Sequence, residues 1–383
     1  MKPPFELSQV IQRFGKEFEA KYSPNGYVRR TLSALLRCRT SALGWHKDKC
    51  DKCGHIRISY NSCRNRHCPK CQNTQREAWI EDRKRDLIPV PYFHVVFTVP
   101  HKLNGMFIRY PVKMYNLLFR SVWETMEQFG YTQLHASTGM FAILHTWGQN
   151  ISLHPHIHCV VPGGGIDYKN QWKQVKVSEN DKTFLYWVEN LSTVFRGKFI
   201  EALDKQLPLE ELFKKELYEY NWVVYSKEPF GGPEQVVKYL SRYTHKVAIS
   251  NHRILNIDDN GVTFLWRDYH DNNKEKIITL PGVEFLRRFC QHILPKRFVR
   301  IRHYGFLACS NRKLLRELQQ AFGIRVPVKN EKKEWKQLCR EHLNYNPDIC
   351  PVCGIGNMIT IEVMLPARAP PRKYASLKYH QPK

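Results

Sequence analysis

The sequence of 383 residues contains no long apolar run. A membrane-spanning helix needs roughly 20 consecutive apolar residues, and no stretch approaches that length. The first residues, MKPPFELSQVIQ, also lack the apolar core of a signal peptide. These absences predict an intracellular protein in a reducing compartment, which we expect to be the cytoplasm.

Acidic residues are scarce relative to basic ones. The chain has 35 Asp and Glu against 60 Lys and Arg, which gives a formal net charge of +25. This excess favours a polyanionic partner, although ribosomal and membrane-surface proteins share it. Internal repeats and a G-x-x-x-x-G-K-[ST] motif are also missing, so the sequence indicates no fused P-loop helicase.

Twelve cysteines at short spacings indicate metal sites in a reducing compartment, and not disulfides. Cys50-x-x-Cys53 and Cys68-x-x-Cys71 form two knuckles, which predict one tetrahedral zinc site. Four protein ligands leave no open position for a substrate, so this zinc would be structural. The knuckles lie in a basic segment whose side chains are candidates for phosphate contacts or a solvated surface: Arg64, Arg66, Lys70 and Arg76.

Other cysteines and histidines lie close to these knuckles in the sequence. They either hold a second zinc or are ordinary buried cysteines and surface histidines: Cys38, His46, Cys63 and His67. A further knuckle, Cys350-Pro-Val-Cys353, occurs near the C-terminus. One pair cannot close a tetrahedral site, so this knuckle is either unliganded or completed by another chain or by one of Cys339, His342 and Cys309.

Two histidines flank one apolar residue in the alternating run HPHIHCVV. Side chains alternate faces along a strand, so His156 and His158 project from the same face. Two imidazoles on one face can bind a divalent metal ion; the alternative is that both are satisfied by hydrogen bonds in a core. Two ligands are too few to fix an ion, so a further ligand is required.

The segment EQVVKYLSRYTHKVAI has helical apolar spacing. Tyr239 and Tyr243 are four residues apart and therefore share one face of the predicted helix. Tyrosine is a weak nucleophile while protonated, with an ordinary pKa of about 10. Neighbouring basic residues would favour the phenolate and bind a substrate phosphate; they are Arg242, His245 and Lys246. A metal on a strand beside tyrosines on a helix predicts cleavage of nucleic acid through a phosphotyrosine.

Seven stretches, in order along the chain, resemble the HUH endonucleases, whose name denotes His-apolar-His. Within that class they are similar to the rolling-circle transposases of the IS91 family. They lie within the region from Leu32 to about Gly354. They are CRTSALGWH, CDKCG, YNSCRNRHCPKCQ, YFHVVFTVP, SLHPHIHCVVPGGG, FGGPEQVVKYLSRYTHKVAIS and RIRHYGFLA. A single His-x-His would be weak support, whereas this ordered set is specific.

The resemblance implies how the site works. It implies a third polar metal ligand, for which Gln149 is the first choice and His145 and His154 are the alternatives. An amide with two imidazoles suits Mg²⁺ or Mn²⁺. The resemblance also implies that tyrosine attacks a DNA phosphate, giving a 5′-phosphotyrosine and a free 3′-hydroxyl. Two tyrosines would allow one to hold a cut end while the other cleaves a second site; alternatively, one of them is a core residue.

We therefore expect an α+β protein with an antiparallel HUH sheet flanked by helices. The expected units are an N-terminal helix (1–31), a zinc-binding module (32–85), the HUH tyrosine nuclease domain (86–250), a C-terminal region with the last knuckle (251–365) and a basic, disordered tail (366–383). In this reading the protein is a transposase that nicks and transfers single-stranded DNA, helped by a host helicase.

Two other functions fit parts of the pattern. A plasmid replication initiator or conjugative relaxase would use the same chemistry. A zinc-dependent, non-catalytic regulator would bind nucleic acid without cutting it. The zinc module and the order of the motifs favour the transposase over the first, and a covalent DNA adduct would exclude the second.

Overall fold

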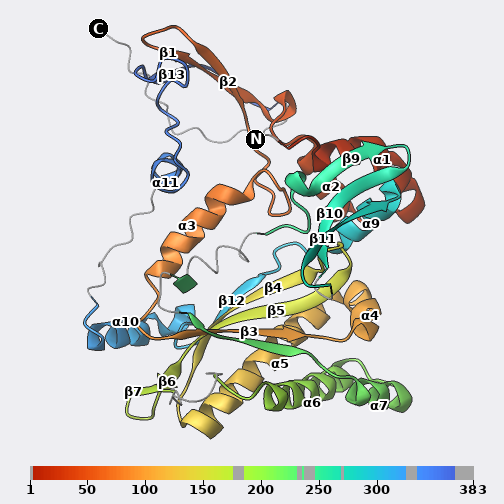
Figure 1. Cartoon of the computed structure of the whole chain (residues 1–383), viewed down its shortest axis with the longest axis vertical. Helices are drawn as coiled ribbons and strands as arrows, with labels where there is room; N and C mark the ends of the chain where they lie inside the picture. Colours follow the sequence, from red (N-terminus) through yellow and green to blue (C-terminus); the bar gives the residue numbers. More distant parts are fainter. Residues whose placement is uncertain are drawn as a thin grey trace.

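The computed structural model describes residues 3–175, 185–230, 235–236, 246–268, 271–324 and 334–366. Within them, helices flank antiparallel sheets, and a cysteine-rich module precedes the largest sheet (Figure 1). The predicted α+β class is therefore confirmed. None of the helices in these ranges is long and apolar enough to cross a membrane.

A five-stranded antiparallel sheet with the order β12-β4-β5-β3-β8 forms the centre of the molecule. Its strands are β3 (Tyr92–Thr98), β4 (Gly139–Trp147), β5 (Leu153–Pro162), β8 (Val224–Phe230) and β12 (Ile301–Gly305). Apolar runs in the sequence predict the first four as strands, and the structure confirms them. It also confirms the hairpin between β4 and β5.

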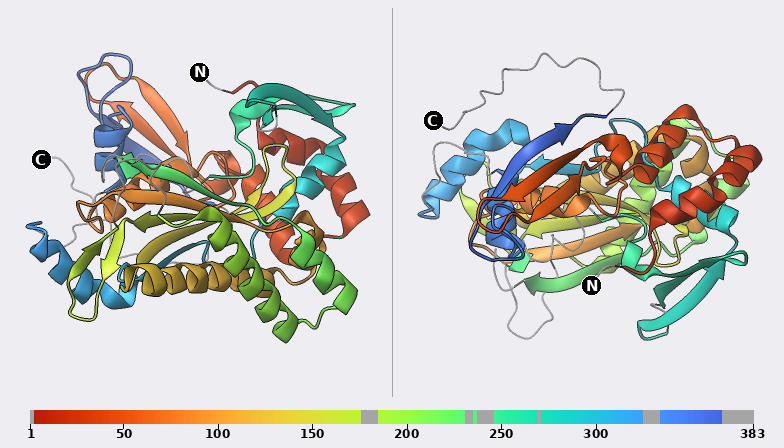
Figure 2. Two further views of the ribbon diagram at one scale, coloured as in Figure 1. Left: turned by 60° about the horizontal axis from the view of Figure 1, so that its bottom comes forward. Right: turned by 90° about the horizontal axis from the view of Figure 1, so that it is seen from above.

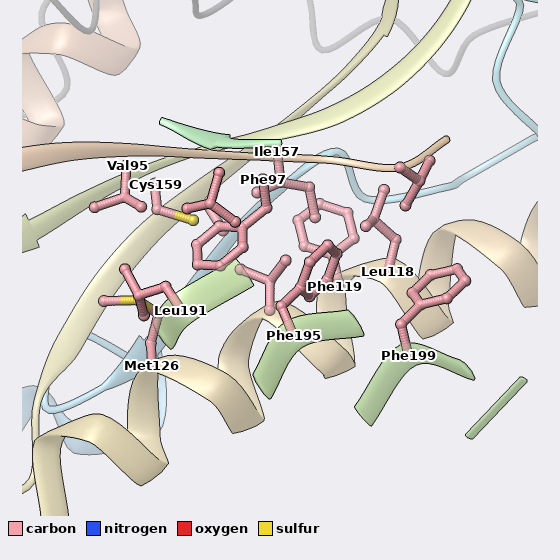
Figure 3. Close-up of a cluster of buried hydrophobic side chains, with 14 of the residues drawn as sticks. Val95, Phe97, Leu118, Phe119, Met126, Ile157, Cys159, Leu191, Phe195 and Phe199 are labelled. Carbon is pink, nitrogen blue, oxygen red and sulfur yellow. The ribbon is translucent and has the colours of Figure 1, made fainter. Parts of the chain in front are cut away.

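Helices cover one face of this sheet. They are α4 (Asn104–Arg109), α5 (Pro111–Phe129), α6 (Val188–Gln206) and α7 (Glu211–Glu219) (Figures 1 and 2). Helical spacing of apolar residues in the sequence predicts helices over 112–129 and 188–205, and the structure confirms them as α5 and α6. Figure 3 shows Phe97, Ile157 and Cys159 from the strands among Phe119 and Phe195 of these helices. This large aromatic core fixes the side of the sheet to which each strand residue points.

The opposite face of the sheet carries a smaller core. It is covered by α3 (Gln72–Lys84) and by α10 (Arg312–Ala321). The sequence predicts a helix from Ala78 to about Leu87, and α3 begins six residues earlier. The buried side chains shared between sheet and helices are Tyr92, Phe141, Ile143, Val160, Ile80, Leu315 and Leu318. Val236 also belongs to this core and is fully buried.

The N-terminal helices form a second body with part of the C-terminal region. α1 (Leu7–Tyr22) and α2 (Gly26–Leu36) pack with α9 (Gly282–Gln291) and the sheet of β9 (Ile254–Asp258), β10 (Gly261–Asp268) and β11 (Lys274–Leu280). The predicted amphipathic N-terminal helix therefore packs on a core. A Cβ at Gly282 would lie 2.2 Å from the ring of Phe14, so α1 and α9 approach closely only because this residue is glycine.

A three-stranded sheet joins the two ends of the chain. β1 (Trp45–Cys50) lies between β2 (Ile56–Tyr60) and the C-terminal strand β13 (Met358–Met364). Figures 1 and 2 show this sheet projecting beyond α11 (Trp335–His342). The two-stranded sheet of β6 (Gly164–Ile166) and β7 (Trp172–Gln174) completes the described strands.

The predicted unit 251–365 is not one body. Its strands belong to three different sheets: β9 to β11 form their own, β12 is an edge of the central sheet, and β13 pairs with β1. Sequence order alone suggested a separate region, because pairing between distant strands leaves no local signal. The predicted tail, apart from residue 366, lies outside the described residues.

Candidate metal and nuclease site

Three imidazoles meet on the face of the central sheet opposite the aromatic helices. In β5, Ile157 and Cys159 point into the helix-covered core, so His156 and His158 point to the other face. The register pairs His156 with His145 of β4. Ring nitrogens of these three histidines all lie within 4.8 Å of one another. The predicted histidine pair therefore gains a third imidazole from the neighbouring strand.

Hydrogen bonds orient two of these rings. Nδ1 of His156 lies 2.7 Å from the backbone oxygen of His154, and Nδ1 of His158 lies 2.9 Å from Nε2 of His94. Nδ1 of His156 donates to a carbonyl oxygen, so its Nε2 can bind a metal, and the same holds for His158 when its Nδ1 donates to His94. Such outer contacts are what metal-binding histidines generally make, and they fit a metal held by His145, His156 and His158.

Burial favours the neutral form of His156 and His158. Burial and, to a smaller extent, the charge of His154 lower the pKa of His156 to about 4. Burial also holds the pKa of His158 well below its usual range, together with the charges of other groups, among them Lys246. Neutral imidazole is the form that binds metals. The field of Lys246 at His158 also shows that the exposed Lys246 lies near the site.

Cross-strand pairing places His145, one of the two alternative third ligands, in the group. His145 stands opposite His156, and its ring stacks on Trp147 with the centroids 4.8 Å apart. Gln149, the first choice, lies in the loop after β4, where its backbone oxygen accepts a hydrogen bond from Arg253. The ring of His154, the other alternative, lies beside His156 but outside the group of three. The choice of Gln149 as a ligand stays a prediction, and His145 joins it as a candidate supported by the geometry.

A tetrahedral cysteine cluster, here called the N-terminal zinc cluster, consists of Cys38, Cys63, Cys68 and Cys71. Its sulfurs are 3.4 Å apart for Cys38 and Cys71, 3.5 Å for Cys38 and Cys68, and 3.7 Å for Cys63 and Cys71. A tetrahedron with Zn–S bonds of about 2.3 Å has sulfurs about 3.8 Å apart. The arrangement thus fits Zn²⁺, although the distances between the sulfurs are slightly shorter than in such a tetrahedron.

A second cluster, the composite zinc cluster, consists of Cys50, Cys53, Cys350 and Cys353. Its sulfurs are 3.7 Å apart for Cys50 and Cys353 and 3.6 Å for Cys53 and Cys350. Backbone N–H groups of Ile355 and Gly356 stabilise the Cys353 thiolate and lower its pKa to about 6. The spacing and the thiolate character both fit Zn²⁺.

The predicted ligand sets were wrong in their pairing. The two N-terminal knuckles do not share one ion, because the first lies at the tip of the β1–β2 hairpin and meets the C-terminal knuckle. That knuckle is completed by Cys50 and Cys53, and not by Cys339, His342 or Cys309. Spacing identifies each knuckle, but the identity of its partner is a property of the fold.

Neither predicted histidine ligand joins the cysteines. Nε2 of His46 lies 3.7 Å from the Asp48 carboxylate. His67 is buried and accepts a hydrogen bond from Arg66, and burial lowers its pKa to about 3. Cys38 and Cys63, the other half of the predicted second site, are ligands of the N-terminal zinc cluster.

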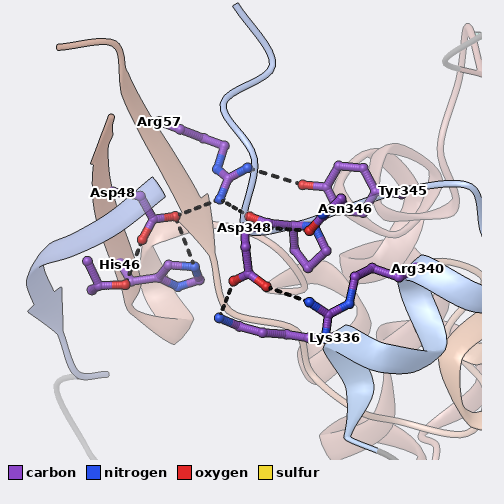
Figure 4. Close-up of polar contacts among 10 residues, drawn as sticks. His46, Asp48, Arg57, Lys336, Arg340, Tyr345, Asn346 and Asp348 are labelled. Atoms are coloured by element: carbon purple, nitrogen blue, oxygen red, sulfur yellow. Dashed lines mark hydrogen bonds and ion pairs between the residues drawn. The ribbon is translucent and has the colours of Figure 1, made fainter. Parts of the chain in front are cut away.

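Polar contacts reinforce the junction of the chain ends (Figure 4). Arg57 on β2 donates to Asp48 on β1 at 3.0 Å and to the backbone oxygen of Pro347 at 3.0 Å. Thr360 on β13 donates to the other oxygen of Asp48 at 2.7 Å. The buried carboxylate of Asp48 therefore links all three strands of the sheet.

The predicted DNA-contacting residues divide into three groups. Arg64 is exposed, whereas the guanidinium of Arg66 donates to backbone oxygens of the 294–298 segment and is used within the fold. Lys246 is exposed near His158. The remaining predicted residues lie outside the described residues: Tyr239, Arg242, Tyr243 and His245.

Sequence reasoning missed His94. Its strand carries Phe93, Val95 and Phe97 toward the helices, so alternation puts His94 on the metal face. A single histidine within an otherwise apolar strand could have been noticed in the sequence as a candidate site residue. The pairing of β3 with β5, which brings His94 to His158, could not be predicted from the sequence of β3 alone.

The group of three imidazoles, the cysteine clusters and the high positive charge are typical of proteins that act on nucleic acid, and comparison with known proteins identifies the family. A family model described as "Putative transposase" matches residues 139–314, and one described as "Transposase zinc-binding domain" matches residues 10–99. No solved structure matches the chain.

Two relatives match over most of their lengths. The "Putative transposase y4qJ" of Sinorhizobium fredii is 41% identical, with 96% of this chain and 97% of the relative aligned. The "Transposase for insertion sequence element IS801" of Pseudomonas savastanoi pv. phaseolicola is 28% identical, with 87% and 83% aligned. The chain belongs to the IS91 family of transposases. This membership favours the transposase over the initiator and relaxase, and the zinc-binding match supports structural Zn²⁺ at the cysteine clusters.

The two cysteine clusters predict two tightly bound zinc ions per chain. We expect Cys353→Ser to lower the zinc content to one and to make the C-terminal segment sensitive to protease, because the composite zinc cluster joins it to the hairpin. Cys68→Ser should lower the folding yield. Elemental analysis measures the zinc content of each variant, and limited proteolysis measures the protease sensitivity of the C-terminal segment. Cys309→Ser, at an exposed cysteine outside both clusters, is the control and should retain two ions. Full zinc content in Cys353→Ser would contradict the assignment.

Buried histidines predict a loss of stability in acid. His292 is fully buried between Thr146 and the Ile151 backbone oxygen, and burial lowers its pKa to about 4. The unfolded chain, with a pKa near 6.5, binds protons first as the pH falls, so stability declines between about pH 6.5 and 4. His292 alone contributes roughly 3 kcal/mol to that decline. Denaturant unfolding at several pH values should show a shallower decline for His292→Gln; an identical decline would refute the assignment.

Proposed function

We propose that this transposase nicks and transfers single-stranded DNA through 5′-phosphotyrosine intermediates, as in rolling-circle transposition. The observation that carries the proposal is the group of three imidazoles on one face of the central antiparallel sheet, His145, His156 and His158, of which burial lowers the pKa of the last two. One ring nitrogen of each lies within 4.8 Å of the others, and the sheet is otherwise packed on both sides. Such a donor set has no structural role that apolar residues would not fill better.

These three residues would hold a divalent ion. When bound, the ion would act as a Lewis acid that polarises a non-bridging oxygen of the scissile phosphate. In this proposal the donor set is three imidazole nitrogens, in place of the two nitrogens and one amide oxygen expected with Gln149. Because Mg²⁺ prefers oxygen ligands, this set favours Mn²⁺ over Mg²⁺.

The tyrosine segment is bounded by two anchors on the metal face. Val236 is helical and buried in the core between the sheet and α3, and Lys246 lies near His158. The predicted helix puts Tyr239 and Tyr243 about one and two turns beyond Val236, on the same side. Both anchors therefore support a nucleophile that faces the imidazoles.

The reaction conserves the phosphodiester bond energy. The tyrosine oxygen loses its proton and attacks phosphorus, a new O–P bond forms, and the 3′-oxygen leaves and takes up a proton as a 3′-hydroxyl. The reverse attack by a 3′-hydroxyl rejoins the strand without ATP. With two tyrosines, one holds a cut end while the other cleaves the target.

The charge of the chain fits a DNA substrate. A net charge of +25 supports binding to any nucleic acid, with steep salt dependence. Cleavage, however, requires one phosphate between the imidazoles and the tyrosine helix, which an unpaired strand reaches more easily than a duplex. We propose a single-stranded or extruded substrate at the element ends and target, and a host helicase as partner at the nucleoid.

The metal assignment predicts which substitutions stop cleavage. His156→Ala with His158→Ala should reduce nicking of a single-stranded oligonucleotide by on the order of 100-fold or more, and His145→Ala should also impair it. EDTA should stop nicking, and Mn²⁺ should restore it at lower concentration than Mg²⁺. Gln149→Ala is the matched comparison and should retain activity. Loss of nicking in Gln149→Ala with full activity in His145→Ala would reverse the ligand choice.

The tyrosine assignment predicts the covalent product. Tyr→Phe removes one oxygen and preserves packing. Each single variant, Tyr239→Phe or Tyr243→Phe, should still form an adduct with labelled single-stranded DNA on a denaturing gel, but should fail in coupled strand transfer. The double variant should form no adduct. Tyr225→Phe, at a half-exposed tyrosine of β8, is the control and should behave as wild type.

Two outcomes of that gel would change the proposal. If Tyr239→Phe alone removes the adduct and Tyr243→Phe transposes normally, Tyr243 is a packing residue. If the double variant still forms an adduct, neither Tyr239 nor Tyr243 is required as the nucleophile, and the proposal is wrong on this point. Equal cutting of relaxed duplex and single strand would contradict the proposed substrate.

A further inference from the structure

A fourth buried histidine touches the metal-binding group without belonging to it. His94 lies on β3, next to β5, and only 2% of its surface is exposed. Its Nε2 is 2.9 Å from Nδ1 of His158, and the two rings are nearly parallel, with centroids 5.2 Å apart and planes 12° apart. The three ligand nitrogens belong to His145, His156 and His158.

This contact determines which nitrogen of His158 is available to a metal. A half-turn of a histidine ring about its Cβ–Cγ bond exchanges the position of Nδ1 with that of Cδ2 and the position of Nε2 with that of Cε1. When Nδ1 of His158 donates to Nε2 of His94, Nε2 of His158 has no proton and is the nitrogen that can bind a metal. Nε2 of His94 is then the acceptor.

The two β5 ligands are therefore held by different means. His156 is bonded to the backbone oxygen of His154, which no substitution removes. His158 is bonded to a side chain, which substitution can remove. His94 itself is confined by its strand, because β3 is paired with β5 on one side and with β8 on the other.

We propose that His94 is a positioning residue that fixes the ring orientation and tautomer of His158 and so prepares it as a metal ligand. The proposal rests on the proposed metal site, although the tautomer of His158 can be measured without metal. His94 would raise metal affinity without contacting the ion, as the outer partners of metal-binding histidines do.

The experiment compares two substitutions of similar size in zinc-loaded protein. His94→Leu fills the space but removes the acceptor, whereas the amide oxygen of His94→Gln can occupy the position of Nε2. We expect His94→Leu to weaken Mn²⁺ binding by about 10- to 100-fold in calorimetric titration, and His94→Gln to stay within a few-fold of wild type. His303→Leu, on the same sheet face but bonded to Arg83, is the control and should bind Mn²⁺ as wild type.

A second measurement on the same proteins separates positioning from packing. Nitrogen-15 spectra of labelled histidines should show His158 as the Nδ1–H tautomer in wild type and His94→Gln, and as a mixture in His94→Leu. Unchanged tautomer and unchanged Mn²⁺ affinity in His94→Leu would overturn the proposal. Equal loss of affinity in Leu and Gln variants with an unchanged tautomer would do so as well, since packing alone would then explain it. If wild type binds no Mn²⁺ but the tautomer responds to His94→Leu, the metal proposal fails and the positioning role stands.

Discussion

The burial of β5 on both faces is the constraint around which the molecule is organised. Alternate residues of this strand have opposite surroundings: Ile157 and Cys159 lie among aromatic side chains, while His156 and His158 lie on the metal face. A shift of one residue in register would place two imidazoles in the aromatic core, where a polar group without a partner costs several kcal/mol. The apolar core thus specifies the register, and the register assembles the site. The same burial removes water from the imidazoles and keeps them neutral, so the fold supplies both the position and the protonation state of the ligands.

Zinc coordination adds a constraint of a different kind, because it joins residues that are far apart in the chain. Cys50 and Cys53 have no complete ligand set until Cys350 and Cys353 reach them. The segment matched by the zinc-binding family model, residues 10–99, contains only half of the composite zinc cluster. A metal that closes a loop of this length stabilises the native state partly by restricting the unfolded chain. The hairpin and the C-terminal strand must therefore fold together. They form the sheet β13-β1-β2, in which the Asp48 carboxylate accepts hydrogen bonds from both neighbouring strands.

How much the sequence revealed depended on whether the signal was local. The strands of the central sheet, the helices α5 and α6 and the knuckles were predicted because alternation, helical periodicity and C-x-x-C spacing are properties of short segments. The HUH pair was found for the same reason. His145 was only one of several candidate third ligands, and the partner of each knuckle and the contact of His94 with His158 were not found, since each arises from pairing between segments. Arg66 shows the same limit in another form: a basic residue in a basic segment looks like a DNA contact until its hydrogen-bond partners are known.

Those partners connect the N-terminal zinc cluster to the metal face. Arg66 lies between the ligands Cys63 and Cys68, and its guanidinium holds the backbone of the 294–298 segment. Two residues later, the backbone oxygen of Arg300 accepts from the amide of Leu144 on β4, and the Arg300 guanidinium donates to the backbone oxygen of Lys246 at 3.0 Å. Zinc at this cluster would therefore fix the loop that carries Arg66, and through it the strand of His145 and the segment of Lys246. The module is connected by backbone hydrogen bonds to the strand of His145 and the segment of Lys246, so it can stabilise the proposed site without contacting DNA.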